Sequence, residues 1–298
     1  MDRQLAKHEV LITWVIRLTG YSSILFVTLI FFFLLREGLP ALSDTTLANL
    51  FNITWYPIEN YFGLLPLIFG SLVVTLGALL IAVPFGLLTA IYISEVASHW
   101  AKEILKPLVE ILAGLPSVVL GFLGILILVP FLRRFLNLPT GLTAFTGSIL
   151  LGLIAIPTIV SISEDALNTV PHSYREASLA LGATQWQTIW HTTLPAARSG
   201  VLTAIMLGIG RAIGETMAVM MVTGNAPVLP HSLEAFFMPA RTMTATIASE
   251  MGEVASGSPH YHVLFLIGIV LFVLSLTINI VVSAVSAQRR KRAERLLS

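Results

Sequence analysis

The chain has 298 residues, of which 56% are hydrophobic and only 11% charged, with a mean hydropathy of +0.87. A soluble globular domain carries about 25% charged residues, so this composition predicts an integral membrane protein. The net charge of +1 gives no indication of nucleic-acid binding, and the absence of cysteine excludes disulfides, thiol catalysis and iron–sulfur clusters.

The N-terminal segment carries an apolar run, residues 20–35, that ends at the charged pair Arg36-Glu37. A signal-peptide core usually has about 7–15 apolar residues followed by a small-residue cleavage site. Because this run is longer and ends in charges, it predicts an uncleaved first membrane helix.

Six segments are long and apolar enough to cross a bilayer, which takes about 20 predominantly apolar residues. They are residues 14–35, 66–93, 107–131, 142–163, 199–222 and 262–285. Glycine and proline inside them are tolerated in a membrane bundle, and we interpret them as kinks or close helix crossings. The sequence therefore predicts an all-α integral membrane protein with six transmembrane helices.

The orientation follows from basic residues that flank the spans, because lysine and arginine accumulate on the cytoplasmic side. Both ends of the chain are basic and should be cytoplasmic, as an even number of spans allows: Arg3, Lys7 and Arg17 at the N-terminus, and Arg289, Arg290, Lys291, Arg292 and Arg295 at the C-terminus. Loops 94–106 and 164–198 then lie inside, and segments 36–65 and 223–261 outside. Arg133 and Arg134 oppose this arrangement.

The sequence shows no tandem repeat and no flexible linker, so we expect one main domain. Residues 1–61 should form an N-terminal tail, a first helix and an external segment. Residues 62–286 should form a five-helix transmembrane core with a cytoplasmic loop at 164–198. A basic tail, 287–298, completes the chain.

Motifs for enzymatic chemistry are missing. A phosphate-binding loop needs G-x-x-x-x-G-K-[ST], and none of the four lysines of the chain follows glycine or precedes serine or threonine. His260 and His262 make an incomplete metal site, and an interfacial pair beside Tyr261 is the better interpretation. No cofactor site is expected.

A polar, turn-rich stretch, residues 171–195, interrupts the apolar pattern between the fourth and fifth spans. Ser173 is a candidate N-cap with Glu176 three residues later, as in a capping box. Gly182 either breaks the helix or allows another chain to approach closely, and Pro195 ends a second short piece. An amphipathic connection with no other role remains the simpler interpretation of such a loop.

The order of residues in this loop nevertheless resembles a family signature. Glu176-Ala177-Ser178, then Gly182, then Leu194-Pro195 is similar to the EAA loop of bacterial ABC importer permeases; Ser178 and Thr192 depart from it. The resemblance implies that Glu176, Ala177 and Gly182 belong to a coupling helix. Such a helix docks on a separate ATPase dimer and transmits its closure to the spans.

Two charged residues, Arg211 and Glu215, lie inside the otherwise apolar fifth span. Each costs roughly 2.5–3.5 kcal/mol at a helix centre, and such residues favour a functional hypothesis. At spacing i, i+4 they are expected to share a helical face and neutralise each other. Gly210 and Gly214 are spaced for a close helix contact, and a guanidinium can bind phosphate-like oxyanions bidentately.

The segment GRAIGETMAV around this pair is similar to the hallmark of phosphate-specific ABC permeases, and the late block ARTMTATIASEMGE is similar to their C-type subunit. The resemblance covers almost all of residues 55–285. It implies that Arg211 and Glu215 take part in phosphate translocation across the bacterial cytoplasmic membrane. It also implies a paralogous permease, two ATP-binding subunits and an external phosphate-binding protein as partners.

Three alternatives remain open at this stage. The permease could carry another oxyanion, molybdate or sulfate, since the EAA loop does not separate these. A secondary anion carrier often shows two related halves, which this chain lacks. A purely structural subunit would leave Arg211 and Glu215 unexplained.

In segment 223–261, Arg241 and Thr242, Thr244 and Thr246 could line an outer vestibule, but capping of a short helix is the preferred interpretation.

Overall fold

The computed structural model describes the backbone of residues 2–229 and 233–297. Side chains are described for all of these except residues 2–11, 233, 282 and 285–297. The basic groups that predicted the orientation, Arg3, Lys7 and the tail 287–298, therefore lie outside the described side chains.

Six helical segments in the described part of the chain are long and apolar enough to span a membrane: Ile12–Asp44, Leu65–Val96, Ser117–Phe135, Ala144–Asn168, Gln185–Gly214 and Pro259–Val281. The helices that build them are α1 (Asp2–Gly38), α4 (Leu65–Ile91), α6 (Ser117–Leu123), α7 (Val129–Phe135), α8 (Ala144–Asn168), α11 (Leu194–Gly214) and α14 (Pro259–Leu297). The predicted all-α class with six spans is confirmed.

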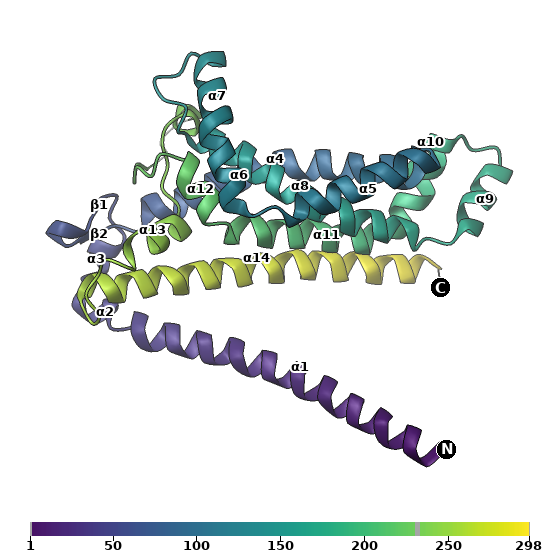
Figure 1. Cartoon of the computed structure of the whole chain (residues 1–298), viewed down its shortest axis with the longest axis horizontal. Coiled ribbons are helices and arrows are strands. Elements are labelled where there is room, and N and C mark those ends of the chain that lie inside the picture. The colour runs from purple at the N-terminus through teal and green to yellow at the C-terminus, as the bar shows by residue number, and fades with distance from the viewer. Residues whose placement is uncertain (1, 230–232, 298) are drawn as a thin grey trace.

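Helices α4, α8, α11 and α14 run alongside one another, whereas α1 diverges from α14 toward its own N-terminus (Figure 1). The second half of α1 packs on the first half of α14 through aromatic pairs. The ring centroids of Phe31 and Phe272 lie 4.8 Å apart, and those of Phe33 and Phe265 lie 5.6 Å apart. The first helix is therefore an addition at the side of a five-helix core, as the sequence predicted.

Helix α8 occupies the centre of this core. Its Ala155 and Ile159 are fully buried and pack with Ala82 of α4. A side chain added at Gly208 of α11 would come within 2.6 Å of Ile159, and one at Gly86 of α4 within 2.8 Å. Small residues thus let both neighbouring helices approach α8 at one level, which is how helices gain packing energy where lipid removes the hydrophobic drive.

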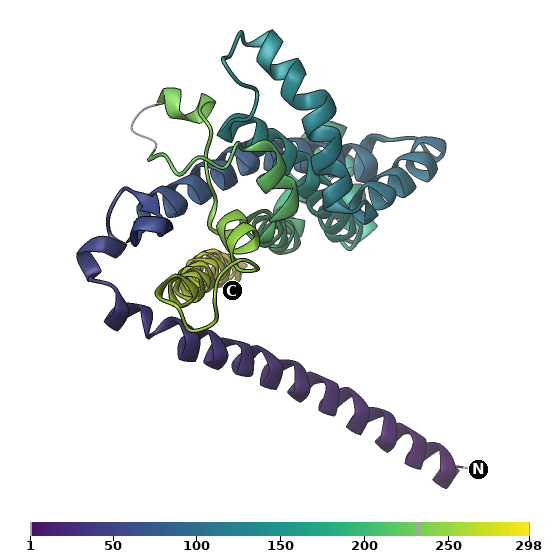
Figure 2. The same ribbon diagram turned by 60° about the vertical axis from the view of Figure 1, so that its left-hand side comes forward.

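The short elements gather at one end of the molecule (Figure 1). They are α2 (Ala41–Asp44), α3 (Leu47–Leu50), β1 (Trp55–Tyr56), η1 (Pro57–Glu59), β2 (Tyr61–Phe62), η5 (Leu233–Phe237) and α13 (Met243–Glu250). The two strands pair antiparallel, with Trp55 opposite Phe62, and this hairpin was not foreseen. Both termini lie at the other end, with α9 (His172–Ala180) and α10 (Gln185–Thr188) (Figure 1). Figure 2 shows the first helix, α1, extending away from the other helices toward the N-terminus.

The third predicted span, 107–131, is not one kinked helix. Helix α5 (His99–Gly114) ends before Leu115, which is extended at φ −66° and ψ 133°, and α6 begins at Ser117. Pro116 causes the break, because a proline disfavours helical backbone at the residue before it. The apolar segment continues from α6 through the π-helical turn η3 (Gly124–Leu128) into α7.

Candidate functional site

Arg211 lies in the last turn of α11 and is half-buried. Its Nη1 donates to Thr158 Oγ1 of α8 at 2.8 Å, and its Nη2 donates to the carbonyl oxygen of Ala113 in α5 at 3.2 Å. The guanidinium therefore joins three helices. A cation in the last turn of a helix is also favoured by the negative end of the helix dipole.

The helix that carries Arg211 ends three residues later. Gly214 is its last residue, and Glu215 is extended at φ −70° and ψ 129°. The Glu215 carboxylate accepts hydrogen bonds from the backbone N–H groups of Thr216 at 3.2 Å and Ala218 at 3.3 Å. It thereby caps α12 (Met217–Val222), whose N-terminal dipole favours a negative charge.

The predicted ion pair between Arg211 and Glu215 is therefore wrong. The i, i+4 rule needs both residues on one continuous helix, and the backbone leaves the helix between them. Each charge is instead stabilised by the end of a half-helix and by neutral polar groups. The predicted fifth span 199–222 is likewise two helices and not one.

The Arg211 guanidinium has no acidic partner among the described side chains. Both of its hydrogen bonds to described residues end on neutral oxygens. The ion pairs among the described side chains place no carboxylate within 4.0 Å of it. A half-buried arginine of this kind is suited to bind an anion.

Three glycines close in sequence to Arg211 or to its partner Ala113 border open space. A Cβ atom added at Gly114, Gly210 or Gly214 would meet no atom within 4 Å, among the residues that the structure describes. Gly210 and Gly214 therefore make no close helix contact with a described residue of this chain, and a close contact with a helix of another chain stays a prediction. Gly208 instead makes a close contact with Ile159 of α8, whereas Gly114, Gly210 and Gly214 border open space among the described residues.

Helix α13 also contacts the backbone where α11 ends. Thr244 donates its hydroxyl to the carbonyl oxygen of Glu215 at 3.1 Å. Thr242 is the N-cap of α13, because its hydroxyl accepts from the N–H of Ala245 at 3.2 Å. The threonines of the late block therefore cap and pack a short helix, as preferred from the sequence, and one of them also holds the backbone at Glu215.

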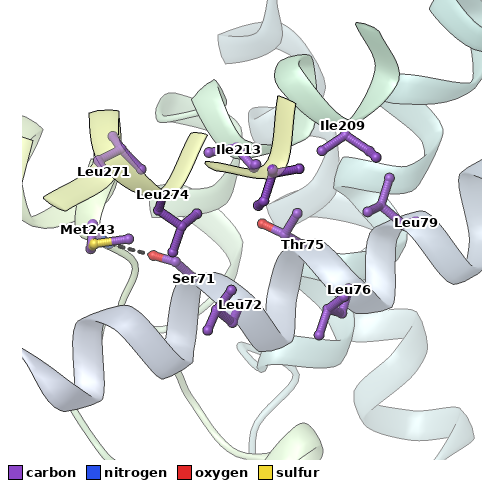
Figure 3. A pocket seen from close by; sticks show the side chains of 11 residues that line it. Ser71, Leu72, Thr75, Leu76, Leu79, Ile209, Ile213, Met243, Leu271 and Leu274 are labelled. Atoms are coloured by element: carbon purple, nitrogen blue, oxygen red, sulfur yellow. Dashed lines mark hydrogen bonds between the residues drawn. The ribbon is translucent and has the colours of Figure 1, made fainter. Parts of the chain in front are cut away.

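An apolar cavity of about 200 Å³ lies nearby between α4, α11 and α14 (Figure 3). Ile209 and Ile213 face it from α11, and Leu271 and Leu274 face it from α14. Arg211 does not line it, and its few polar groups include the Ser71 hydroxyl, which accepts from the Met243 N–H at 2.8 Å. This cavity offers no charge to an anion and is separate from the arginine.

The second candidate site is the loop that contains α9 and α10. Helix α9 begins at His172 after Pro171, and no side chain caps its first turn. The predicted Ser173–Glu176 capping box is wrong because the helix begins one residue before Ser173, which therefore lies inside the first turn. The capping box is found at α10, where Thr184 Oγ1 accepts from the Gln187 N–H at 3.3 Å and Gln187 Oε1 accepts from the Thr184 N–H at 2.8 Å.

Gly182 ends α9 in a left-handed conformation, at φ +86°. Its N–H donates to the carbonyl oxygen of Leu179 at 2.9 Å, and the N–H of Ala183 donates to that of Ser178 at 3.2 Å. These two bonds form a Schellman motif, in which glycine is preferred because other residues are strained at positive φ. Of the two roles considered for Gly182, the structure therefore shows the helix-breaking one.

The outer surface of this loop is open. Glu176, Ala177 and Gly182 are all exposed, and the Glu176 carboxylate makes no hydrogen bond or ion pair with a described residue. Large apolar side chains accompany them: Leu181 is 89% exposed and Trp186 is 59% exposed. An exposed acidic and apolar surface on two short helices is suited to contact another protein.

The two histidines in the first turn of α14, His260 and His262, are not partners of each other. His260 Nε2 lies 2.8 Å from Glu250 Oε2, and His262 Nδ1 lies 2.6 Å from Asp44 Oδ2. The described residues contain no group of three or more metal-ligating side chains. Both histidines therefore join α14 to neighbouring short elements.

Sequence reasoning missed Thr158 and Ala113, the partners of Arg211, and Glu95, which binds Arg175 of α9. Thr158 and Ala113 carry no distinctive signal, because a threonine or a backbone carbonyl in an apolar run looks ordinary. Glu95 was detectable in principle. An acidic residue at the end of an apolar run needs a partner, although the sequence does not say which.

Known proteins resemble this chain over most of its length. Residues 82–292 match the family model described as binding-protein-dependent transport system inner membrane component. The chain is 43% identical over 241 residues to Probable ABC transporter permease protein YqgH of Bacillus subtilis, with 80% of this chain and 77% of that protein covered.

Two further relatives carry the name phosphate transport system permease protein PstC. The one from Xylella fastidiosa strain Temecula1 is 34% identical over 267 residues, covering 83% of this chain and 81% of that protein. The one from Haemophilus influenzae is 30% identical over 292 residues, covering 88% and 90%.

A chain of the MetNI methionine ABC transporter, solved in an inward-facing conformation, shares the fold. It superposes with a TM-score of 0.56 at 21% identity, over 76% of this chain and 94% of that one. Since the family model spans more than half of the chain and the relatives cover more than two thirds of it, the chain belongs to the family of binding-protein-dependent transport system inner membrane components.

Proposed function

We propose that this chain is the permease subunit of an ATP-driven importer that carries inorganic phosphate across the bacterial cytoplasmic membrane. The observation that carries the proposal is Arg211, a guanidinium within the membrane-spanning core whose partners among the described residues are neutral and whose neighbouring glycines border open space. The names of the PstC relatives support phosphate as the cargo.

The chemistry of Arg211 suits a dehydrated oxyanion. A guanidinium carries five N–H donors in a planar fork, and Thr158 and Ala113 occupy two of them. The remaining donors can bind two oxygens of one phosphate group. Because no described carboxylate pairs with the guanidinium, an arriving anion need not displace an ion pair with a described residue.

Glu215 has a different part in this proposal. Its carboxylate caps α12 and fixes the break that follows Gly214. It keeps the extended segment in place beside Arg211, and its negative charge disfavours anions that Arg211 does not hold. Arg211 is the binding group, and Glu215 shapes the site around it.

Energy comes from another protein in this proposal, since the sequence has no phosphate-binding loop of its own. Glu176, Ala177 and Gly182 form the contact for an ATPase dimer, because they lie on the open surface of α9 and of the turn that follows it. ATP binding closes the ATPases and opens the permease pair outward, and hydrolysis resets it. A paralogous permease, two ATP-binding subunits and an external phosphate-binding protein complete the assembly.

The orientation follows from the position of α9. Both termini lie at the same end of the molecule as α9 (Figure 1), so all three are cytoplasmic if α9 meets the ATPases. The segment with the hairpin and α13 then faces outward, toward the binding protein. Residues 62–286 form the permease core, 1–61 the N-terminal addition and 287–298 the basic tail.

The test is reconstitution of the whole complex. The chain is purified with its co-assembling subunits, placed in vesicles, and supplied in turn with phosphate, sulfate and molybdate, with and without ATP. We expect ATP-dependent uptake of phosphate in preference to the other two. Preferred uptake of sulfate or molybdate would assign a different oxyanion, and uptake without ATP would make the protein a secondary carrier.

A further inference from the structure

Arg175, in the first turns of α9, forms a bidentate ion pair with Glu95. Its Nε donates to Glu95 Oε2 at 3.1 Å and its Nη2 to Glu95 Oε1 at 2.6 Å. Glu95 lies in the π-helical turn η2 (Tyr92–Val96), which continues directly from α4. The side chains are only 16% and 8% exposed, and a buried pair requires such geometry to offset its desolvation.

The same guanidinium also caps the end of α8. Its Nη1 donates to the carbonyl oxygen of Val170 at 2.7 Å, and its Nη2 donates to that of Leu167 at 2.9 Å. The last carbonyls of a helix have no partner within the helix. Arg175 supplies donors to one carbonyl in the last turn of α8, that of Leu167, and to one just beyond it, that of Val170. One side chain therefore connects α4, α8 and α9.

Helix α10, the second helix of the loop, is also attached to Glu95. Gln185 of α10 donates through Nε2 to the carbonyl oxygen of Glu95 at 3.0 Å. The hydroxyls of Ser178 in α9 and Thr188 lie 3.0 Å apart and are hydrogen-bonded. The inner side of the loop is thus held at Glu95, while its outer side, with Glu176, stays open.

Helix α8 connects the Arg175–Glu95 pair to Arg211. The carbonyl of Leu167 accepts from Arg175, and the hydroxyl of Thr158 accepts from Arg211. The two acceptors lie roughly 14 Å apart along one helix, at 1.5 Å per residue. A displacement of the end of α8 therefore reaches a group that directly orients Arg211.

We propose that Arg175 and Glu95 are positioning residues that lock α9 to the ends of α4 and α8, so that α9 and α8 move as one body and displace Arg211. This inference rests on the proposed role of α9 as the ATPase contact. It predicts that the lock is needed for coupling and is not needed for the ATPase to bind, because the outer surface of α9 does not include Arg175 or Glu95.

The first test measures whether Arg175 and Glu95 hold α9 at a fixed distance from α4. The chain has no native cysteine, so single cysteines introduced at Ser173 of α9 and Leu88 of α4, both exposed, can carry spin labels without background from this chain. The complex with its ATPase subunits is measured without nucleotide and with trapped ATP, in the absence of any transported anion. For the parent we expect a narrow distribution of distances between the two spin labels in both states. For Arg175→Gln and Glu95→Gln we expect a broader distribution.

The second test measures coupling, as the ratio of anion uptake to ATP hydrolysed in vesicles. Coupling free energies between sites typically correspond to at least about fivefold, and we expect a loss of that size or more for Arg175→Gln and Glu95→Gln. Arg175→Lys should be intermediate, because lysine keeps the charge and loses the planar fork. Glu103→Gln is the control, since it removes an exposed ion pair with His99.

Pull-down of the ATPase subunits separates misfolding from uncoupling, and all variants should retain it. The proposal would be overturned if Arg175→Gln kept both a narrow distance distribution and the parental coupling ratio. It would also be overturned if Arg175→Gln and Glu95→Gln both lost ATPase binding. The distance test needs no transported anion. If the parent fails to take up phosphate, the proposed function fails while the lock is still decided.

Discussion

The guanidinium of Arg211 bonds to α5 and α8, whereas the carboxylate of Glu215 bonds to the first turn of α12, because helix α11 ends at Gly214 between the two residues. The spacing of Arg211 and Glu215 in the sequence predicts an internal ion pair, but in the structure the two side chains have separate partners and separate roles. The arginine remains free to bind an anion, and the glutamate holds the shape of the broken helix. The two residues should consequently differ in what their replacement does.

Replacement of Arg211 by glutamine should abolish phosphate uptake without preventing assembly. Glutamine can still reach a hydrogen-bond partner but removes the charge that an oxyanion needs. The measurement is ATP-dependent phosphate uptake in vesicles, with pull-down of the ATPase subunits as the assembly control. Full uptake by Arg211→Gln would remove this residue from the translocation path.

Replacement of Glu215 should depend on whether an acceptor oxygen remains. Glu215→Gln keeps an acceptor for the N–H groups of Thr216 and Ala218 and should reduce uptake only mildly. Glu215→Ala loses the cap, which is worth about 1 kcal/mol, and should lower both the melting temperature and the uptake. If Glu215→Gln were as inactive as Arg211→Gln, a direct charge role for the carboxylate would be required.

The sequence predicted the class of the fold because the apolar runs are long and the bilayer fixes the length of a span. It placed the breaks badly, because a helix end within an apolar run is decided by tertiary partners. The break after Gly214 depends on the Glu215 cap and on Thr244 of α13, which is remote in sequence. The break before Pro116 was the more predictable one, since proline acts locally.

The same distinction applies to the candidate sites. Glu176, Ala177 and Gly182 could be named because their spacing resembles a family signature, and Arg211 because a charge in an apolar run is conspicuous. The partners of these residues could not be named. Glu95 and Thr158 meet Arg175 and Arg211 only through the packing of α4 and α8, and no periodicity in the sequence encodes that.

Thr158 should matter for transport through its hydroxyl alone. Thr158→Val keeps the shape and removes the acceptor for Arg211 Nη1, so the guanidinium loses one of its two fixed points. We expect uptake to fall about tenfold, within the range that small misplacements of a binding group produce. Thr158→Ser retains the hydroxyl and serves as the matched control, with uptake close to that of the parent.

The effect would be measured as initial rates of ATP-dependent uptake over a range of phosphate concentrations. A raised half-saturation concentration in Thr158→Val is expected, because the substrate-binding group is misplaced. Parental kinetics in Thr158→Val would show that Arg211 does not need this contact.

Gly182 should be sensitive to side chains that resist left-handed backbone. At φ +86° a β-branched residue is strained, at roughly 1–2 kcal/mol for an ordinary side chain, and Gly182→Val should open the end of α9. The variant should insert and hydrolyse ATP but transport poorly. Gly182→Asn is the control, because asparagine tolerates this conformation and a Cβ atom at this position meets no described atom within 4 Å.

These Gly182 variants are compared by the ratio of uptake to ATP hydrolysis, with membrane insertion checked by fractionation. Normal coupling in Gly182→Val would contradict a need for the Schellman ending. Equal uncoupling in Gly182→Asn would point to contact with the ATPase surface as the reason for glycine.

Glu250 of α13, outside the membrane-spanning segments, should make stability fall in acid. Its carboxylate accepts from the Trp55 indole at 3.2 Å, pairs with Arg241 and lies 2.8 Å from His260. Burial raises the pKa of Glu250, but the bond with His260, the charge of Arg241 and the bond from Trp55 together hold that pKa below its ordinary value of 4.5. A carboxylate of this kind stabilises the folded state above its unfolded pKa.

The stabilisation should therefore be fully present above pH 4.5 and be lost as the pH falls through the lowered pKa of the folded state. Glu250→Gln should melt at a lower temperature than the parent near neutral pH, and this difference should shrink on acidification below 4.5. The measurement is thermal unfolding of the purified protein in detergent over that range. Glu253→Gln, which changes an exposed residue of the same segment, should follow the parent at every pH. A difference between parent and Glu250→Gln that stays constant into strong acid would show that the ionised carboxylate does not hold α13 to Trp55 and α14.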